Sequence, residues 1–320
     1  MSPLHDRGAP NIDSPALWLA FLAGVLVLLA FDLRAASRRT EAQGFRGALG
    51  WSLFWIVLSL AFGGYIWTRY GGEPGLEFFA GYMLEKSLSV DNLFVFVLIF
   101  RSFAIPARLQ HRVLFWGVLG ALVLRGALIG IGLGLVHRFH FIVILFGVVL
   151  IVTAVRLLFG PNEPAHSPED SWLVRQVRNR LPVTSTLEGP AFFVREGGKL
   201  LATPLLLAVV AAESADLVFA LDSIPAVFAV TDDSFLVFSS NVCALLGLRA
   251  LYFVVAGALS RVRYLRHGLA AILLFVGGKM MVDPWVQIPT GGSLAVIAAI
   301  FSVALLASWR KAPVESAREP

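Results

Sequence analysis

Cysteine is nearly absent from this sequence, since Cys243 is the single cysteine among 320 residues. One thiol excludes an intramolecular disulfide framework, a zinc site built from several thiolates and an iron–sulfur cluster. Charge is also scarce: Asp, Glu, Lys and Arg make up 15% of the chain, against about 25% in ordinary globular domains. Hydrophobic residues reach 58%. This composition argues against a soluble enzyme and indicates an integral membrane protein.

The apolar residues are gathered in long runs, each near the roughly 20 residues that a helix needs to cross a bilayer. The runs cover about 15–33, 48–68, 76–100, 112–135, 139–159, 203–230, 235–259, 268–283 and 291–309. We therefore predict an all-α integral membrane protein with nine transmembrane helices. The basic cluster of the first run follows it instead of preceding it, so we expect this helix to be retained and not cleaved as a signal peptide.

The basic residues predict the orientation of these helices. With the N-terminus outside, the inner loops and the C-terminal tail hold 19 of the 26 Lys and Arg residues, and the outer segments hold Arg7, Arg69 and Arg138. The positive-inside rule translates this asymmetry into an outer N-terminus and an inner C-terminus. Because topology explains the net charge of +5, we expect a lipid bilayer and no nucleic acid as partner.

The first half of the chain is partly repeated in the second half. Glu85 and Asp91 of EKSLSVDNLFVF recur as Asp216 and Asp222 of DLVFALDSIPAVF, with the same six-residue step. The next helices also match, ALVLRGAL with LLGLRALY and then LIVTAVRLL with LLFVGGKMM. Because the third run points inward and the sixth outward, the order predicts an inverted repeat of helices 3–5 and 6–8, on which many secondary transporters are built.

The repeat divides the chain into five segments. We predict peripheral transmembrane helices in 1–75, a first transport repeat in 76–159, a basic cytoplasmic loop in 160–202, a second transport repeat in 203–284, and a ninth helix with a cytoplasmic tail in 285–320. Within the loop, SWLVRQVRNRL has the spacing of an amphipathic helix and FFVREGGKLLAT that of a β-hairpin. The loop either lies on the anionic inner leaflet or is an ordinary linker.

Ionisable side chains inside the predicted spans are the candidates for function. The carboxylates there are Glu85, Asp91, Glu213, Asp216 and Asp222. An ionised carboxylate at the bilayer centre costs at least about 2.5–3.5 kcal/mol, so partners, water, protons or a cation must compensate it. The candidate counter-ions in the same spans are Lys86, Arg125, Arg249 and Lys279. They leave one negative charge of the set without a counter-ion, and a divalent cation or exchangeable protons could balance it.

Pro225 is the main irregularity of the sixth run. It removes a backbone hydrogen bond and disfavours helical geometry at Ile224, so we predict a helix break that turns Asp222 toward the other acids. Asn92 adds a neutral oxygen ligand, whereas the six histidines lie at helix ends or in loops. Such an oxygen set suits Mg²⁺, Ca²⁺ or Mn²⁺ better than zinc or copper. The simpler alternative is that acids and bases pair as structural links between helices.

The segments EKSLSVDN, ESADLVFALDSIPAVFAVT, SSNVCALLGLRALYF and GGKMMVD resemble the TerC/Alx family of bacterial inner-membrane proteins, and the likeness covers nearly the whole chain. This resemblance implies a multi-pass protein of the bacterial inner membrane that exports a divalent metal, with Mn²⁺ as the expected substrate. Carried over residue by residue, it implies metal binding by Glu85, Asp91, Asn92, Glu213, Asp216 and Asp222.

Older names in the same family imply tellurium resistance or redox modulation. The alternative function is therefore a membrane component of a tellurite or redox stress-resistance complex that acts by binding a partner. A homo-oligomer is compatible with both functions. No nucleophile stands beside a base at a usable spacing and no phosphate-binding glycine loop is present, so we predict neither an enzyme nor a tightly bound cofactor.

Overall fold

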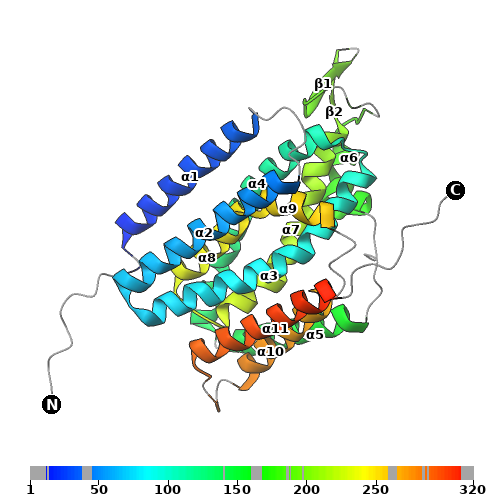
Figure 1. Cartoon of the computed structure of the whole chain (residues 1–320). Coiled ribbons are helices and arrows are strands. Elements are labelled where there is room, and N and C mark those ends of the chain that lie inside the picture. Colours follow the sequence, from blue (N-terminus) through cyan, green and yellow to red (C-terminus); the bar gives the residue numbers. More distant parts are fainter. Residues whose placement is uncertain are drawn as a thin grey trace, which may run out of the picture.

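The computed structural model describes residues 12, 14–37, 45–139, 141–159, 168–184, 187, 189–196, 198–258, 265–282, 285, 286 and 288–310. Over these residues the chain is a bundle of helices with one small two-stranded sheet at its edge (Figure 1). The start of the predicted basic loop, 160–167, and the tail after 310 lie outside the described residues.

Each of the nine apolar runs is helical. The helices of these runs are α1 (Pro15–Ser37), α2 (Phe45–Tyr70), α3 (Gly72–Ser102), α4 (Ala107–Arg138), α5 (Phe141–Phe159), α7 (Pro204–Phe228), α8 (Ser234–Leu246), α9 (Leu248–Ala258), α10 (Leu265–Val282) and α11 (Thr290–Arg310). The seventh run forms two of them, α8 and α9. The central loop contains the 3₁₀ turn η1 (Pro168–Asp170), α6 (Trp172–Arg180), β1 (Phe193–Glu196) and β2 (Lys199–Ala202).

The described residues contain six helices that are long and apolar enough to cross a membrane, namely α1, α2, α4, α5, α7 and α11. Counting the bent pair α8 and α9 as one span gives seven, and not the nine that the sequence predicts. The two remaining runs are α3, which contains Glu85, Lys86 and Asp91, and α10, which has Arg266 and Lys279 near its ends. The chain is thus an all-α, multi-pass integral membrane protein.

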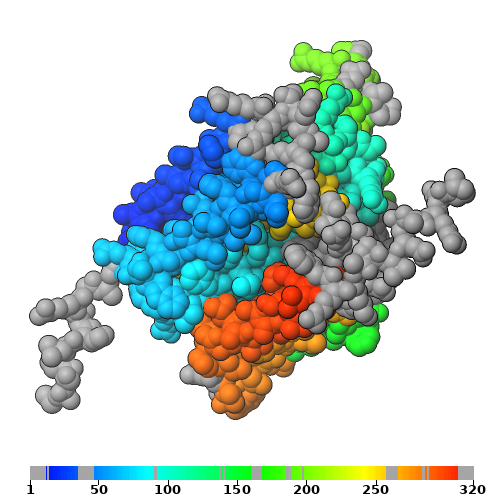
Figure 2. Space-filling model, viewed as in Figure 1, coloured from blue at the N-terminus to red at the C-terminus, as the bar shows by residue number. Residues whose placement is uncertain are grey.

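Helix α3 lies at the centre of the bundle although it is one of the more charged helices. It packs against α2, α7, α8, α9, α10 and α11. Its residues Phe78, Leu84, Leu93 and Ile99 are fully buried. In Figure 2, α1 (blue) covers one edge of the molecule and α10 and α11 (orange to red) cover the opposite edge. Glu85, Ser87, Ser89 and Asn92 near the middle of α3 are buried as well, so other helices enclose these polar side chains.

Helices α5 and α10 make a close contact at two glycines. An ideal Cβ at Gly277 would lie 2.9 Å from the carbonyl oxygen of Gly147 and 2.9 Å from Cγ1 of Ile151. Small residues that let two backbones approach in this way are typical of packed transmembrane helices. The contact joins the last helix of each predicted repeat.

We expect Gly277→Ala to lower the free energy of unfolding by about 1–3 kcal/mol, because the added methyl group meets backbone that cannot rotate away. The neighbouring Gly278→Ala is the matched control, since nothing lies within 4 Å of its Cβ position. Thermal unfolding of both purified variants in detergent measures the difference. Equal midpoints would show that α5 and α10 are not in close contact here.

The central loop confirms both local predictions. Ser171 caps α6 by accepting a hydrogen bond from the backbone N–H of Val174, at 3.4 Å. Strands β1 and β2 pair antiparallel from Phe193 opposite Ala202 to Glu196 opposite Lys199. The buried Val174 turns the apolar face of α6 toward the bundle, where α6 packs against α7. Contact of α6 with the inner leaflet would therefore use its exposed, arginine-rich face.

The segment at Pro225 does not unwind as predicted. Helix α7 stays helical through Pro225 and ends at Phe228. Because Pro225 lies in the last turn of α7, it removes one backbone hydrogen bond without ending the helix. The bend lies instead in the next run, where α8 and α9 meet at Gly247 with an angle of 44°. A Cβ at Gly247 would lie 2.9 Å from Nζ of Lys86. Glycine at the bend makes room for the lysine of α3.

Candidate functional site

Arg125 of α4 joins two of the predicted carboxylates in the protein interior. Its Nη1 donates to Oε2 of Glu85 on α3 at 2.7 Å, and its Nη2 donates to Oδ1 of Asp216 on α7 at 2.9 Å. Its Nε donates to Oδ2 of Asp216 at 3.1 Å, so the guanidinium holds this carboxylate through two nitrogens. Such fork-shaped charge-assisted hydrogen bonds are strong and fix the geometry of both groups.

Two neutral side chains complete this arrangement. Asn241 of α8 donates through Nδ2 to Oε1 of Glu85 at 2.7 Å, and its Oδ1 lies 3.4 Å from Nη1 of Arg125. The hydroxyl oxygen of Ser223 also accepts from this Nη1 at 3.4 Å. We call Glu85, Arg125, Asp216, Ser223 and Asn241 the Arg125 network. It links α3, α4, α7 and α8.

The Arg125 network is withdrawn from solvent and carries unbalanced charge. Arg125 and Glu85 are each 1% exposed and Asp216 is 7% exposed. With both carboxylates ionised, two negative charges face one positive charge. Removing ions from water costs several kcal/mol each, so the site depends on its complete set of hydrogen bonds. The extra negative charge would favour a proton or a cation at this position.

The other two acids of α7 lie outside the Arg125 network. Glu213 points at α4, where a Cβ added at Gly120 would overlap its carboxylate. Its buried Oε1 has no hydrogen-bond partner among the described residues. Asp222 accepts a hydrogen bond through Oδ1 from the hydroxyl of Thr153 on α5, at 2.9 Å. The structure thus brings Glu85 and Asp216 together and leaves Glu213 and Asp222 at separate positions along α7.

The remaining predicted ligands are on α3. Asn92 is buried there, at 6% exposed. Asp91 belongs to the same helix, but its side chain lies outside the described residues. Within the part of the chain that the structure describes, there is no group of three or more His, Cys, Asp or Glu side chains that could hold a metal ion.

The two lysines among the predicted counter-ions bind backbone carbonyls at the ends of helices. Lys86 donates to the carbonyl of Ala244 near the C-terminus of α8, at 3.3 Å. Lys279 donates to the carbonyl of Ala229, which caps the C-terminus of α7, at 3.0 Å. A cation at a helix C-terminus is favoured by the helix dipole and by the unpaired carbonyls. Each lysine therefore binds a carbonyl near the C-terminus of a helix of the second predicted repeat.

Arg249, by contrast, meets none of the predicted carboxylates among the contacts of the described residues. It forms an ion pair with the side chain of Asp32 on α1, and its Nη2 also donates to the backbone carbonyl of Asp32 at 2.9 Å. Asp32 was missed by the sequence reasoning, although it lies inside the first apolar run. The pair ties α1 to α9 near one end of the bundle.

Three further polar residues of the site were also missed: Thr153, Ser223 and Asn241. Asn241 could have been noticed, because it ends a run of polar residues, Ser239 to Asn241, within an otherwise apolar helix. Ser223 is adjacent to Asp222 in the DSIP segment. Thr153 carries no signal in the sequence, since single threonines are common in apolar helices.

The helices and the buried ion pairs define the class of this molecule, a multi-pass integral membrane protein with an ionised network in its interior. The family model "Integral membrane protein TerC family" matches residues 70–315. The chain therefore belongs to the TerC family, as its motifs indicate.

Relatives of this chain match it over almost its whole length. A protein of Myxococcus xanthus described as an uncharacterized membrane protein is 48% identical, and the alignment covers 97% of this chain and 98% of the relative. Alx of Escherichia coli (strain K12) is 43% identical over 90% of this chain and 92% of the relative. Alx of Photorhabdus laumondii is 43% identical over 92% and 95%. The names of both Alx proteins propose that they are membrane-bound redox modulators. No solved structure gave a significant match.

Proposed function

We propose that this protein is a transporter of the bacterial inner membrane that exports a divalent metal cation, with Mn²⁺ as its substrate. The observation that carries the proposal is the Arg125 network. Four oxygen-bearing side chains from three helices converge there on one buried cationic group. Ionised groups inside a membrane protein mark ion pathways more often than structural links.

The donor set of the Arg125 network suits a hard cation. Two carboxylates, one amide oxygen and one hydroxyl face the guanidinium, and such oxygen ligands fit Mn²⁺, Mg²⁺ and Ca²⁺. The charge also fits, because the carboxylates of Glu85 and Asp216 together balance a divalent ion. In this proposal Arg125 holds the two carboxylates in place while no metal is bound. It moves aside when the metal enters.

The acids of α7 are spaced as steps along a path. Glu213 lies three residues before Asp216 and Asp222 lies six residues after it, or about 4.5 Å and about 9 Å along the helix axis. With the N-terminus outside, α7 runs outward. Glu213 is then on the cytoplasmic side of the Arg125 network and Asp222 on the periplasmic side. Proton return through one of these acids provides the energy for export.

We further propose that α3 and α10 also cross the membrane, which gives nine spans and the inverted repeat of α3–α5 and α7–α10. Three packing features support this. The first is the contact of α5 with α10, the second is that of α3 with α8, and the third is that of α7 with α4. A two-fold axis in the membrane plane would exchange the last two contacts. Rocking of the two repeats about the Arg125 network would then expose it to each side in turn.

We expect Glu213→Gln and Asp222→Asn each to reduce Mn²⁺ uptake into inside-out vesicles to the level of vesicles that lack the protein. The lumen of such vesicles corresponds to the periplasm, so export appears as uptake. The matched control is Glu77→Gln, because Glu77 is also a partly buried helical carboxylate but pairs with Thr231, at 2.7 Å, away from the Arg125 network. Wild-type uptake in both α7 variants would contradict this path.

The second candidate function is partner binding in a stress-resistance complex. The exposed basic face of α6, with Arg175, Arg178 and Arg180, and the names of the Alx relatives favour it. Replacement of the three arginines by serine separates the two functions. A transporter keeps its flux in this variant. If the protein is a component of a stress complex, the variant loses its bound partner in a pull-down, and neither the wild-type protein nor the variant shows metal flux.

A further inference from the structure

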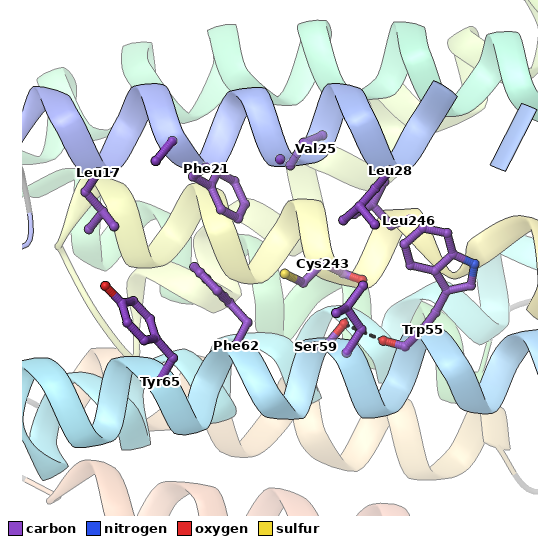
Figure 3. Close-up of a pocket in the computed structure, with 13 residues that line it drawn as sticks. Leu17, Phe21, Val25, Leu28, Trp55, Ser59, Phe62, Tyr65, Cys243 and Leu246 are labelled. Atoms are coloured by element: carbon purple, nitrogen blue, oxygen red, sulfur yellow. Dashed lines mark hydrogen bonds between the residues drawn. The ribbon is translucent and has the colours of Figure 1, made fainter. Parts of the chain in front are cut away.

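A cavity of about 370 Å³ lies between α1, α2 and α8 (Figure 3). Leu17, Phe21, Val25 and Leu28 of α1 point across it toward Tyr65, Phe62, Ser59 and Trp55 of α2, and Cys243 and Leu246 of α8 close its inner side. We call this cavity the α1 slot. It is partly open at the surface of the bundle.

The walls of the α1 slot are apolar. The hydroxyl of Ser59 does not offer a free donor, because it is placed to donate to the carbonyl of Trp55 at 2.8 Å or of Cys243 at 3.3 Å. The remaining walls are mainly aliphatic and aromatic. An apolar cavity of this kind stays dry and takes apolar ligands. The slot therefore fits a hydrocarbon and not a polar molecule.

The dimensions of the slot distinguish between apolar occupants. From Leu17 to Leu28 it follows eleven residues of α1, or about 16 Å of helix rise. Measured up to the surfaces of its walls and with its open side included, the void is about 900 Å³, which is less than the roughly 1,250 Å³ of an α-helix of this length about 10 Å wide. A helix of a second protein does not fit. One extended hydrocarbon chain does.

The slot occupies one leaflet of the bilayer. It begins near the first residue of α1, Pro15, and ends near the middle of that helix. Its length of about 16 Å equals half of the roughly 30 Å hydrocarbon core. Tyr65 stands at one end and Trp67 follows on the same helix, both about half exposed, as is typical of aromatic side chains at the membrane interface. Leu19 and Leu26 of α1 do not line the slot, and their side chains are exposed on the surface of the bundle.

We infer that the α1 slot binds one acyl chain of a phospholipid from the leaflet at the N-terminal end of α1. The ester end of the chain lies near Tyr65 and its methyl end lies near Trp55. The lipid fills the space between α1 and α2 and so completes the packing of α1. This site is separate from the Arg125 network and does not depend on the proposed transport.

The test uses the full-length protein in lipid nanodiscs that contain a phosphatidylcholine with a photoreactive diazirine near the methyl end of one acyl chain. After illumination, mass spectrometry locates the adducts. Trp55, Cys243 and Leu246 are diagnostic, because they are 2%, 7% and 6% exposed and general contact with the bilayer does not reach them. We expect adducts on these residues as well as on Leu19 and Leu26.

Gly24→Phe provides a variant that fills the slot, since Gly24 lines it and nothing lies within 4 Å of its Cβ position. We expect adducts on the three diagnostic residues to disappear while those on Leu19 remain, which also shows that α1 is still in the membrane. Gly50→Phe is the control, because Gly50 on α2 has equally open space but does not line the slot. Ala20→Phe fills the same slot if Gly24→Phe does not fold.

Four outcomes would overturn the inference, and the last of them is a reversed position of the adducts along the slot. The first is labelling of Leu19 and Leu26 without any adduct on Trp55, Cys243 or Leu246. The second is diagnostic labelling that persists in both slot-filling variants. The third is diagnostic labelling by a diazirine fatty acid but not by the phospholipid, which would assign the slot to a free fatty acid. A diazirine placed near the ester should move the adducts toward Tyr65, and the reverse order would place the lipid in the other leaflet.

Discussion

Replacement of Arg125 by methionine is expected to lower the free energy of unfolding by about 3–5 kcal/mol, because it leaves two buried carboxylates without their counter-ion. Methionine keeps much of the apolar stem of arginine, so the loss reports charge and hydrogen bonds more than volume. Glu85 and Asp216 would then repel each other across the interface of α3 and α7. Thermal unfolding in detergent at neutral pH measures the effect.

The control and the rescue for this prediction are both available in the chain. Arg178→Met removes an exposed ion pair with Glu169, whose atoms lie 3.6 Å apart, and such surface pairs contribute only about 0–1 kcal/mol. Adding Glu85→Gln and Asp216→Asn to Arg125→Met removes all three charges, and we expect most of the stability to return. A triple variant no more stable than Arg125→Met would show that the ionic network does not determine stability here.

Asp216→Asn is expected to abolish Mn²⁺ flux while the protein stays folded. Asparagine keeps the shape and one acceptor for Arg125, which still pairs with Glu85. The metal, however, loses one of two balancing charges. Two unit charges about 4 Å apart at an effective dielectric of 20 already contribute about 4 kcal/mol. Because Mn²⁺ carries two charges, metal affinity should fall by at least about a thousandfold.

Glu85→Gln should give the same loss of flux, because the two carboxylates contribute equally to the charge balance. Uptake of Mn²⁺ into inside-out vesicles measures both variants, with the unfolding midpoint recorded for each. Glu77→Gln again serves as the control on α3. Normal flux in Asp216→Asn and Glu85→Gln would place the metal path elsewhere and leave the Arg125 network as a structural link.

The positions of the helices could be predicted from the sequence because apolar runs of the right length are a local signal. The hairpin β1–β2 and α6 were predictable for the same reason. The prediction that α7 unwinds at Pro225 was wrong, since a proline near the end of a helix removes a single hydrogen bond and does not unwind the preceding turns. The bend at Gly247 depends on Lys86 from another helix, and a contact so distant in the chain leaves no local pattern.

The charged members of the Arg125 network could be named from the sequence, but their pairing could not, and the neutral members Ser223 and Asn241 were missed. The match of ALVLRGAL with LLGLRALY singled out Arg125 and Arg249 without saying which acid either would meet. Arg125 meets Glu85 and Asp216, whereas Arg249 meets Asp32. Which acid meets which base depends on helix packing and rotation, and these are set by contacts between distant segments.

The most direct measurement of the central claim is Mn²⁺ uptake by proteoliposomes that contain only the purified protein. The proposal predicts saturable uptake in the presence of a proton gradient for the wild-type protein, and none above protein-free liposomes for Asp216→Asn reconstituted at equal density. Wild-type uptake no greater than that of protein-free liposomes, with or without the gradient, would contradict it.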